Sequence, residues 1–243
     1  GLMFYGVSEP MSHFSSSLGG VAVGEDGLRT DWAPLAGAAG DAAAAERLGM
    51  AATIFHWGLH PWAIYAVVAL ALALFSFNKG LPLTMRSILY PLIGERIYGP
   101  IGHLVDILTV AITAFGVSQS LGLGVTQINT GLHQVFGIPV SLGMQVMLIA
   151  LISFAATMSV MSGVSRGIRR LSEWNMLLSV LLIAVVLLIG PTRYLLNTTL
   201  ESTGDYLQNI VGLSFWSDTQ KDSGWQSWWT AFYWPWWMTW APF

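Results

Sequence analysis

Two stretches of the sequence are unusually rich in aromatic side chains. Residues 55–65 read FHWGLHPWAIY, and residues 228–243 read WWTAFYWPWWMTWAPF. An aromatic ring attracts a cation over its face, and each ring contributes roughly 0.5–1 kcal/mol when exposed and about 2 kcal/mol when desolvated. Three or four desolvated rings would supply much of the roughly 8 kcal/mol that micromolar affinity requires. The residue types therefore favour binding of a quaternary ammonium group, whose diffuse charge is easily dehydrated.

The spacing of these rings argues against a purely interfacial role. A single tryptophan near the end of a membrane span is most simply explained by the preference of indole for the headgroup zone. Residues 228–240 hold six tryptophans, and a helix of that length climbs about 18 Å, so one interface cannot accommodate them all. Two groups crowd together at helical spacing, namely Trp236, Trp237 and Trp240, and Trp57, Trp62 and Tyr65 around Pro61. We expect that no acid or base accompanies these rings, so that π faces and backbone groups meet the ligand's charge.

Other candidate residues have simpler explanations. His56 and His60, four residues apart, could form a zinc pair or a proton relay. We expect no carboxylate or further histidine to accompany them, so both should pack against the wall of a cavity. Asp106 is expected to complement the positive end of a helix dipole. Nothing resembles a nucleophile–base pair, a phosphate-binding loop or a metal cluster, so the sequence predicts no enzyme, metal site or cofactor.

The amino-acid composition is that of a membrane protein. The chain is 54% hydrophobic and 9% charged, whereas soluble domains are roughly 25% charged. A membrane-spanning helix needs about 20 apolar residues, and several runs qualify, so we predict an all-α integral membrane protein. The net charge of −3 gives no reason to expect nucleic acid as a partner, and no cysteine is present to form a disulfide.

The apolar runs place the elements. We predict spans at about 1–10, 59–78, 104–126, 139–163, 175–192 and 228–243, separated by loops at 11–47 and 193–227, with a short surface helix at about 164–174. Glu9 and Pro10 are expected to end the first span. Because the chain opens on Gly1 inside an apolar helix and stops at Phe243 inside an aromatic one, we expect residues 1–243 to be a piece of a single, longer transmembrane domain.

The charges of the loops predict the orientation of the chain. Residues 79–103 carry three basic residues against one acid, and residues 164–174 carry three arginines against one acid, so each segment has a net charge of +2. Residues 11–47 and 193–227 have net charges of −3 and −2. Since cytoplasmic loops are enriched in Lys and Arg, we expect the two basic segments to face the cytoplasm. Arg166, Arg169 and Arg170 are expected to hold the surface helix against anionic lipid of the bilayer.

At the two aromatic stretches the sequence resembles the betaine/choline/carnitine transporter family, and the resemblance covers the whole chain. FHWGLHPWAIY resembles the family's fourth-helix segment, and WTAFYWPWW (229–237) resembles its eighth-helix signature. The resemblance implies a multi-helix bundle with a LeuT-like inverted-repeat core, truncated here to the end of helix 3 through the middle of helix 8. It implies a substrate site made by Trp57, Trp62, Tyr65 and Trp237, with Trp236 and Trp240 in support.

The resemblance also bears on the coupling ion. In sodium-coupled members, two hydroxyls one turn apart on the fifth helix and the phenylalanine that closes the eighth-helix motif form a cation site. Thr113 supplies one hydroxyl and Phe243 is present, but Val117 stands where the second hydroxyl is expected. Gly1 stands where choline-selective, proton-coupled relatives carry an acid. The resemblance therefore favours Na⁺ as the coupling ion, with H⁺ as the alternative, and glycine betaine as the substrate.

Together these observations predict a secondary active transporter of the bacterial inner (plasma) membrane. It would import a quaternary ammonium osmolyte, with glycine betaine favoured, by alternating access. One alternative is a proton-coupled choline or carnitine transporter of the same family, and another is a non-transporting membrane sensor or scaffold. A homotrimer is expected by resemblance.

Overall fold

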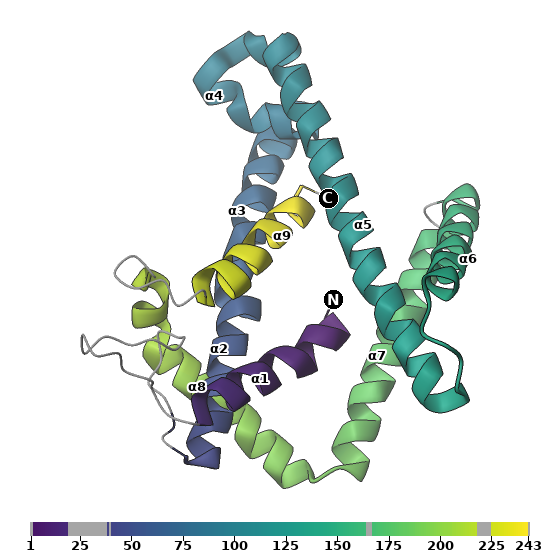
Figure 1. The fold of residues 1–243 in the computed structure, drawn as a ribbon. Coiled ribbons are helices and arrows are strands. Elements are labelled where there is room, and N and C mark those ends of the chain that lie inside the picture. Colours follow the sequence, from purple (N-terminus) through teal and green to yellow (C-terminus); the bar gives the residue numbers. More distant parts are fainter. Residues whose placement is uncertain (1, 19–37, 39, 164–166, 218–224, 243) are drawn as a thin grey trace. The chain divides into compact units, whose positions relative to one another are not determined.

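The computed structural model describes residues 2–18, 38, 40–163, 167–217 and 225–242, and every regular element among them is helical (Figure 1). The α-helices are α1 (Leu2–Leu18), α2 (Ala42–Trp57), α3 (Leu59–Ala73), α4 (Tyr90–Ile93), α5 (Pro100–Phe136), α6 (Leu142–Met161), α7 (Arg169–Ile189), α8 (Thr192–Phe215) and α9 (Ala231–Trp240). Short turns of other helix types are η1 (Leu74–Asn78), η2 (Met85–Leu89), η3 (Gly94–Tyr98) and η5 (Gln226–Thr230).

The chain divides into two compact units. One unit holds residues 120–201, which include the second half of α5, α6, α7 and the start of α8. The other holds residues 2–119 and the chain from residue 202 onward. All of the aromatic residues singled out above belong to this second unit, where α1 packs on α2 and α9 lies alongside α3 (Figure 1).

Four helical stretches of the described chain are long and apolar enough to cross a membrane: Ala42–Asn78, Pro100–Phe136, Leu142–Met161 and Arg169–Ile189. Large apolar side chains along them are exposed, as at Leu70, Leu151 and Leu181. A soluble monomer rarely exposes apolar surface on this scale, whereas helices whose backbone groups are paired internally can face hydrocarbon at no such cost. The helices therefore have the character of membrane spans.

Helix α1 continues past the point where the sequence analysis ended it. Pro10 lies inside the helix, which runs to Leu18, so the predicted end at Glu9 and Pro10 is wrong. A proline inside a helix removes one backbone hydrogen bond, and membrane helices tolerate this where neighbouring helices compensate. Helix α2 approaches closely here, because a Cβ at Gly49 would lie only 2.8 Å from the carbonyl oxygen of Pro10.

The predicted span at 59–78 is the second part of a longer helical stretch that begins with α2. The Asp41 side chain caps α2 by accepting hydrogen bonds from the backbone N–H groups of Ala43 and Ala44. The stretch is broken at Gly58, where a Cβ would lie 2.5 Å from the carbonyl oxygen of Ile54, so only glycine fits. The break separates Trp57, the last residue of α2, from the residues on α3.

Two further predictions about elements are corrected by the structure. Residues 193–215, predicted as part of a polar loop, belong to α8. The segments at 164–174 and 175–192, predicted as a surface helix and a separate span, are continuous from Arg169 to Ile189 in α7, while Arg166 lies outside the described residues. The remaining spans start and end a few residues from their predicted limits, with α5 ten residues longer at its end.

Helix α8 is held by its one buried face. Ser202, Tyr206 and Leu213 recur at helical spacing and are buried, although most of α8 is polar. Tyr206 and Leu213 belong to a core that joins α2, α8 and Trp225, and its members are Ala51, Ala52, Phe55, Tyr206, Leu213 and Trp225. This core fixes the α2 end on which the candidate site is built.

Candidate functional site

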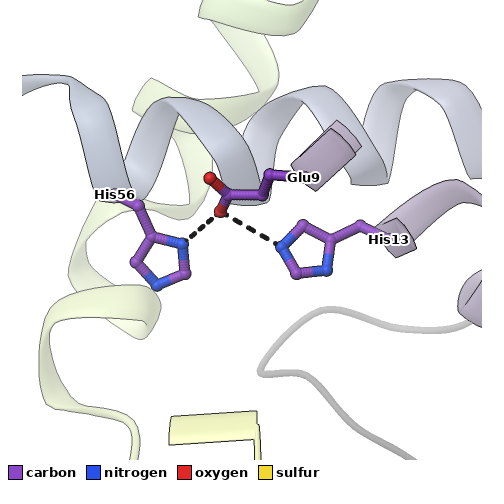
Figure 2. Close-up of side chains that lie close together, drawn as sticks. All are labelled: Glu9, His13 and His56. Atoms are coloured by element: carbon purple, nitrogen blue, oxygen red, sulfur yellow. Dashed lines mark hydrogen bonds and ion pairs between the residues drawn. The ribbon is translucent and has the colours of Figure 1, made fainter. Parts of the chain in front are cut away.

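A buried cluster of ionisable side chains lies where α1 crosses α2 (Figure 2). Glu9 and His13 are four residues apart, so they share one face of α1. Glu9 Oε1 lies 3.2 Å from His13 Nε2 and 2.5 Å from Nδ1 of His56 on α2. All three side chains are at most 1% exposed. A buried charge is tolerated only where it is paired and hydrogen-bonded, and here the two imidazoles meet that requirement.

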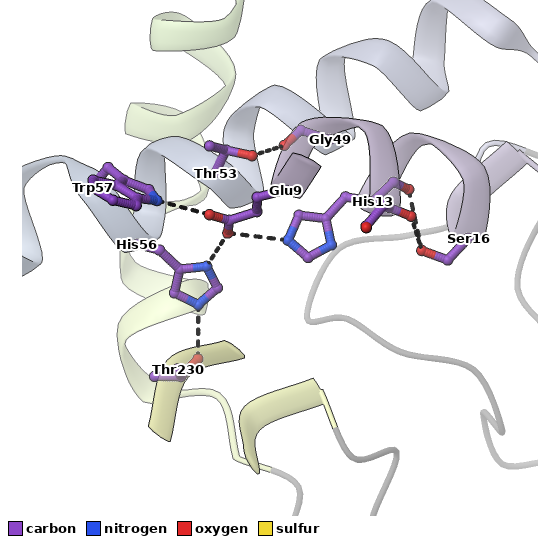
Figure 3. A network of polar contacts seen from close by, with 9 residues as sticks. Glu9, His13, Ser16, Gly49, Thr53, His56, Trp57 and Thr230 are labelled. Carbon is purple, nitrogen blue, oxygen red and sulfur yellow. Dashed lines mark hydrogen bonds and ion pairs between the residues drawn. The ribbon is translucent and has the colours of Figure 1, made fainter. Parts of the chain in front are cut away.

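The cluster is connected to two further residues (Figure 3). The indole N–H of Trp57 donates to the second carboxylate oxygen, Oε2 of Glu9, at 2.8 Å. His56 Nε2 lies 2.9 Å from the hydroxyl of Thr230 in η5. One glutamate therefore links α1 to α2, and through His56 to the segment that leads into α9. This overturns the expectation that no acid accompanies the aromatic residues and that no carboxylate or further histidine contacts His56.

The predicted aromatic residues of the two distant stretches come into contact next to this cluster. The ring centroids of Trp57 and Trp237 are 5.0 Å apart, and their planes are perpendicular at 88°. Tyr65 meets Trp237 at 5.7 Å and 73°. The indole N–H of Trp237 donates to the backbone carbonyl of His56 at 3.2 Å. Three of the six predicted residues thus form one group of half-buried rings.

The other three predicted residues lie at the margins of this group. Trp62 is 5.8 Å from Tyr65 between ring centroids, but its side chain is 65% exposed. Trp236 is buried and stacks at 6.5 Å on Trp237, with Tyr5 also in contact. Trp240 lies against α5, where its indole nitrogen is 3.6 Å from the position of a Cβ at Gly116.

The residues proposed for ion coupling lie where α5 meets α9. The hydroxyl of Thr113 donates to the backbone carbonyl of Thr239 at 3.3 Å. The two helices are in close contact, because a Cβ at Gly116 would lie 2.2 Å from the hydroxyl oxygen of Thr239. Val117, at the expected position of the second hydroxyl, is 41% exposed. Phe243 and Gly1 lie outside the described residues.

The two histidines that the sequence analysis paired have different partners. His60 Nδ1 lies 3.1 Å from the hydroxyl of Tyr206, and its Nε2 lies 2.7 Å from the hydroxyl of Ser214. Its ring stacks on Trp234 at 5.6 Å, in line with the expected packing role. His56 and His60 therefore do not form a zinc pair, because the nitrogens of each bind separate groups.

Glu9, His13 and His56 are the one group of three ligand-type side chains close enough to hold a metal ion within the described chain. Tetrahedral Zn²⁺ with ligand bonds of about 2.0–2.1 Å separates neighbouring ligand atoms by well over 3 Å. Glu9 Oε1 and His56 Nδ1 are 2.5 Å apart, which is the spacing of a short hydrogen bond. The geometry is that of a hydrogen-bonded network.

A cavity of about 610 Å³ opens further along α3, and its lining includes Leu72, Met85, Thr109 and Pro242. Asp106 also lines it, and does not act only at the helix end as expected: its Oδ2 lies 3.0 Å from Nε of Arg86, and its Oδ1 accepts from the backbone N–H of Arg86. The cavity adjoins the basic segment 79–103, which the charge pattern predicts to be cytoplasmic.

Glu9 is a residue of the candidate site that could not be identified from the sequence. It was interpreted as the end of a helix because it precedes a proline. An ionisable residue inside an apolar helix is itself a signal, since such residues in membranes usually face the protein interior and pair there. Its partners His56 and Trp57 are 47 and 48 residues away in sequence, so spacing alone could not identify them.

Comparison with known proteins shows that the whole chain matches one family of transporters. The sequence model of the betaine/carnitine/choline family transporters matches residues 1–243. Over its full length the chain is 55% identical to a glycine betaine/proline/choline transporter of Vibrio parahaemolyticus, 45% identical to a glycine betaine transporter of the same organism, and 43% identical to a glycine betaine transporter of Bacillus subtilis. It spans 44%, 43% and 44% of the lengths of these relatives. The relatives are named as transporters rather than enzymes.

Proposed function

Because the chain belongs to the betaine/carnitine/choline transporter family, an all-helical family of membrane transporters, we propose that it carries the substrate site of a secondary transporter for a quaternary ammonium osmolyte. Glycine betaine is the favoured substrate, since it appears in the names of the three relatives described above. Import by alternating access and location in the bacterial inner membrane are parts of the same proposal.

The observation that carries the proposal is the convergence of Trp57 and Tyr65 with Trp237. Perpendicular rings 5.0 and 5.7 Å apart have the arrangement of adjacent walls of an aromatic cage, in which one cation can face several rings. A trimethylammonium group suits such a site, because it offers no N–H donor and loses little hydration on entry. Each desolvated ring would contribute about 2 kcal/mol.

The polar edges of the two indoles are already occupied by protein groups. Trp57 donates its N–H to Glu9, and Trp237 donates its N–H to the carbonyl of His56. The indole faces are therefore the groups left to interact with a ligand. This supports recognition of a methylated cation over recognition of a substrate that needs hydrogen-bond donors from the protein.

We further propose Na⁺ as the coupling ion, with Thr113 as one of its ligands. Hard cations bind oxygen ligands, and the Thr113 hydroxyl and the Thr239 carbonyl provide two oxygens 3.3 Å apart. The contact joins α5 to α9, the helix that carries Trp237, so an ion bound here would act on the substrate site. H⁺ is the alternative, and the LeuT-like inverted repeat, the trimer and the anionic-lipid contacts stay predictions.

The 610 Å³ cavity beside α3 supports a route toward the cytoplasm. It is lined by the last residues after α9, Ala241 and Pro242, and by Asp106 of α5. Since the neighbouring segment 79–103 is the one predicted to face the cytoplasm, we assign the cavity as the inner vestibule through which substrate leaves.

Transport by the complete protein tests the proposal. Proteoliposomes that contain the full-length transporter should accumulate radiolabelled glycine betaine under an inward Na⁺ gradient. Choline uptake driven by a proton gradient would favour the first alternative, for which the name of the Vibrio parahaemolyticus glycine betaine/proline/choline transporter gives a reason. Failure to accumulate glycine betaine, choline or carnitine under any gradient would leave only the sensor or scaffold.

A further inference from the structure

The proposed site uses the faces of aromatic rings, but a carboxylate lies at the polar edge of one of them. Glu9 is fully buried, and burial of a charged group is costly unless the group is paired and hydrogen-bonded. Its two oxygens have different partners. Oε1 faces the imidazoles of His13 and His56, while Oε2 accepts from the indole of Trp57.

We propose that Glu9 is a positioning residue for the quaternary ammonium site that also makes Trp57 a stronger cation partner. The inference rests on the proposed function, since it concerns the same site. An indole N–H can only donate, so its orientation toward Oε2 is unambiguous. At 2.8 Å the contact has the length of a charge-assisted hydrogen bond. Donation to an anionic acceptor shifts electron density from the N–H into the ring, and the ring face becomes more negative.

The charge of Glu9 acts on the ligand as well. A carboxylate at the edge of the indole attracts a cation bound over the ring face, and this attraction is weakly screened where water is excluded. A neutral group of the same shape at this position would keep the packing and lose the attraction. The site would therefore recognise the positive charge of its ligand through a residue that does not touch the ligand.

The same residue sets the distance between the two indoles. Through His56, Glu9 is linked to Thr230 in η5, which leads directly into α9. Trp237 of α9 in turn donates to the backbone carbonyl of His56. Both ring N–H groups are thus bound to adjacent elements of one network, and the perpendicular placement of Trp57 and Trp237 follows from it.

The test compares two ligands of equal shape and different charge. Glycine betaine and 3,3-dimethylbutanoate differ in one atom, a carbon in place of the quaternary nitrogen. Binding of each is measured on the full-length transporter in detergent, by displacement of radiolabelled glycine betaine. Glu9→Gln should lower the affinity for glycine betaine about tenfold, which corresponds to a loss of about 1.4 kcal/mol of binding free energy. The affinity for 3,3-dimethylbutanoate, which is an anion, should stay unchanged or rise.

Matched variants complete the design. Glu201→Gln makes the same chemical change at an exposed glutamate on α8 and should alter neither affinity. Trp57→Phe removes the N–H while keeping a ring, and in that background Glu9→Gln should have a smaller effect than in the wild type. If Glu9→Gln does not fold, Glu9→Asp takes its place, because it keeps the negative charge on a shorter side chain. It should lower the affinity for glycine betaine by less than tenfold and leave the affinity for 3,3-dimethylbutanoate unchanged.

Each outcome decides between the two claims. If Glu9→Gln lowers the affinities for both ligands equally, Glu9 only supports the fold. If it leaves the affinity for glycine betaine unchanged, the charge of Glu9 does not act on the bound ligand. Either result overturns this inference and leaves the proposed function intact. Absence of glycine betaine binding by the wild-type transporter would instead overturn the proposed function.

Discussion

Replacing Trp237 by leucine tests the aromatic site most directly. The ring is the one that meets both Trp57 and Tyr65, so its loss removes a wall shared by the two contacts. A desolvated ring contributes about 2 kcal/mol to cation binding, and the lost hydrogen bond to the His56 carbonyl adds about 1 kcal/mol through looser placement of α9. Together they amount to about 3 kcal/mol, or a weakening of glycine betaine binding by about 150-fold.

The assay is equilibrium binding of radiolabelled glycine betaine to the purified full-length transporter, with thermal unfolding as the check on folding. Trp237→Phe keeps a ring and should lose less, about tenfold. Trp62→Leu is the matched comparison, because its side chain is 65% exposed and an exposed ring contributes only about 0.5–1 kcal/mol. An affinity of Trp237→Leu equal to that of the wild type, or a larger loss at Trp62, would refute the site as described.

Further predictions follow from the packing and from the charges. Gly116→Ala should impair folding and transport, because its Cβ would lie 2.2 Å from the Thr239 hydroxyl, whereas Gly143→Ala, with no heavy atom within 4 Å of its Cβ, should be tolerated in thermal unfolding and uptake assays. Thr113→Val should raise the Na⁺ concentration needed for half-maximal uptake about tenfold, and an unchanged Na⁺ dependence would contradict the ion assignment. Glu173→Gln should change the free energy of unfolding by less than about 0.5 kcal/mol, since its ion pair with Arg169 is exposed.

The aromatic part of the site could be predicted because its signal is local. Trp57, Trp62 and Tyr65 fall within nine residues, and six tryptophans fall within residues 228–240. Aromatic ring faces attract cations, so residue type alone favours the hypothesis of a cation site. The structure then shows that the rings of Trp57, Tyr65 and Trp237 meet, which the sequence could suggest but not establish.

Glu9 could not be interpreted in the same way, because its meaning depends on a contact across 48 residues. Next to Pro10 it has the local pattern of a helix end, and only the packing of α2 against α1 shows that both residues are interior. Helix α8 was missed for a related reason. Its composition is polar, and a single face marked by Tyr206 and Leu213 carries the packing.

The break at Gly58 lies between Trp57 and Tyr65, two aromatic residues of the proposed substrate site, and places them on different helices. Trp57 is the last residue of α2, and Tyr65 lies two turns into α3. The backbone N–H of Leu59 binds the hydroxyl of Tyr206 instead of a helical carbonyl, and Pro61 has no N–H to satisfy. The hydrogen-bond ladders of α2 and α3 are therefore separate at this point. A tilt of α2 against α3 at Gly58 would move Trp57 away from Tyr65 and so open the proposed aromatic cage.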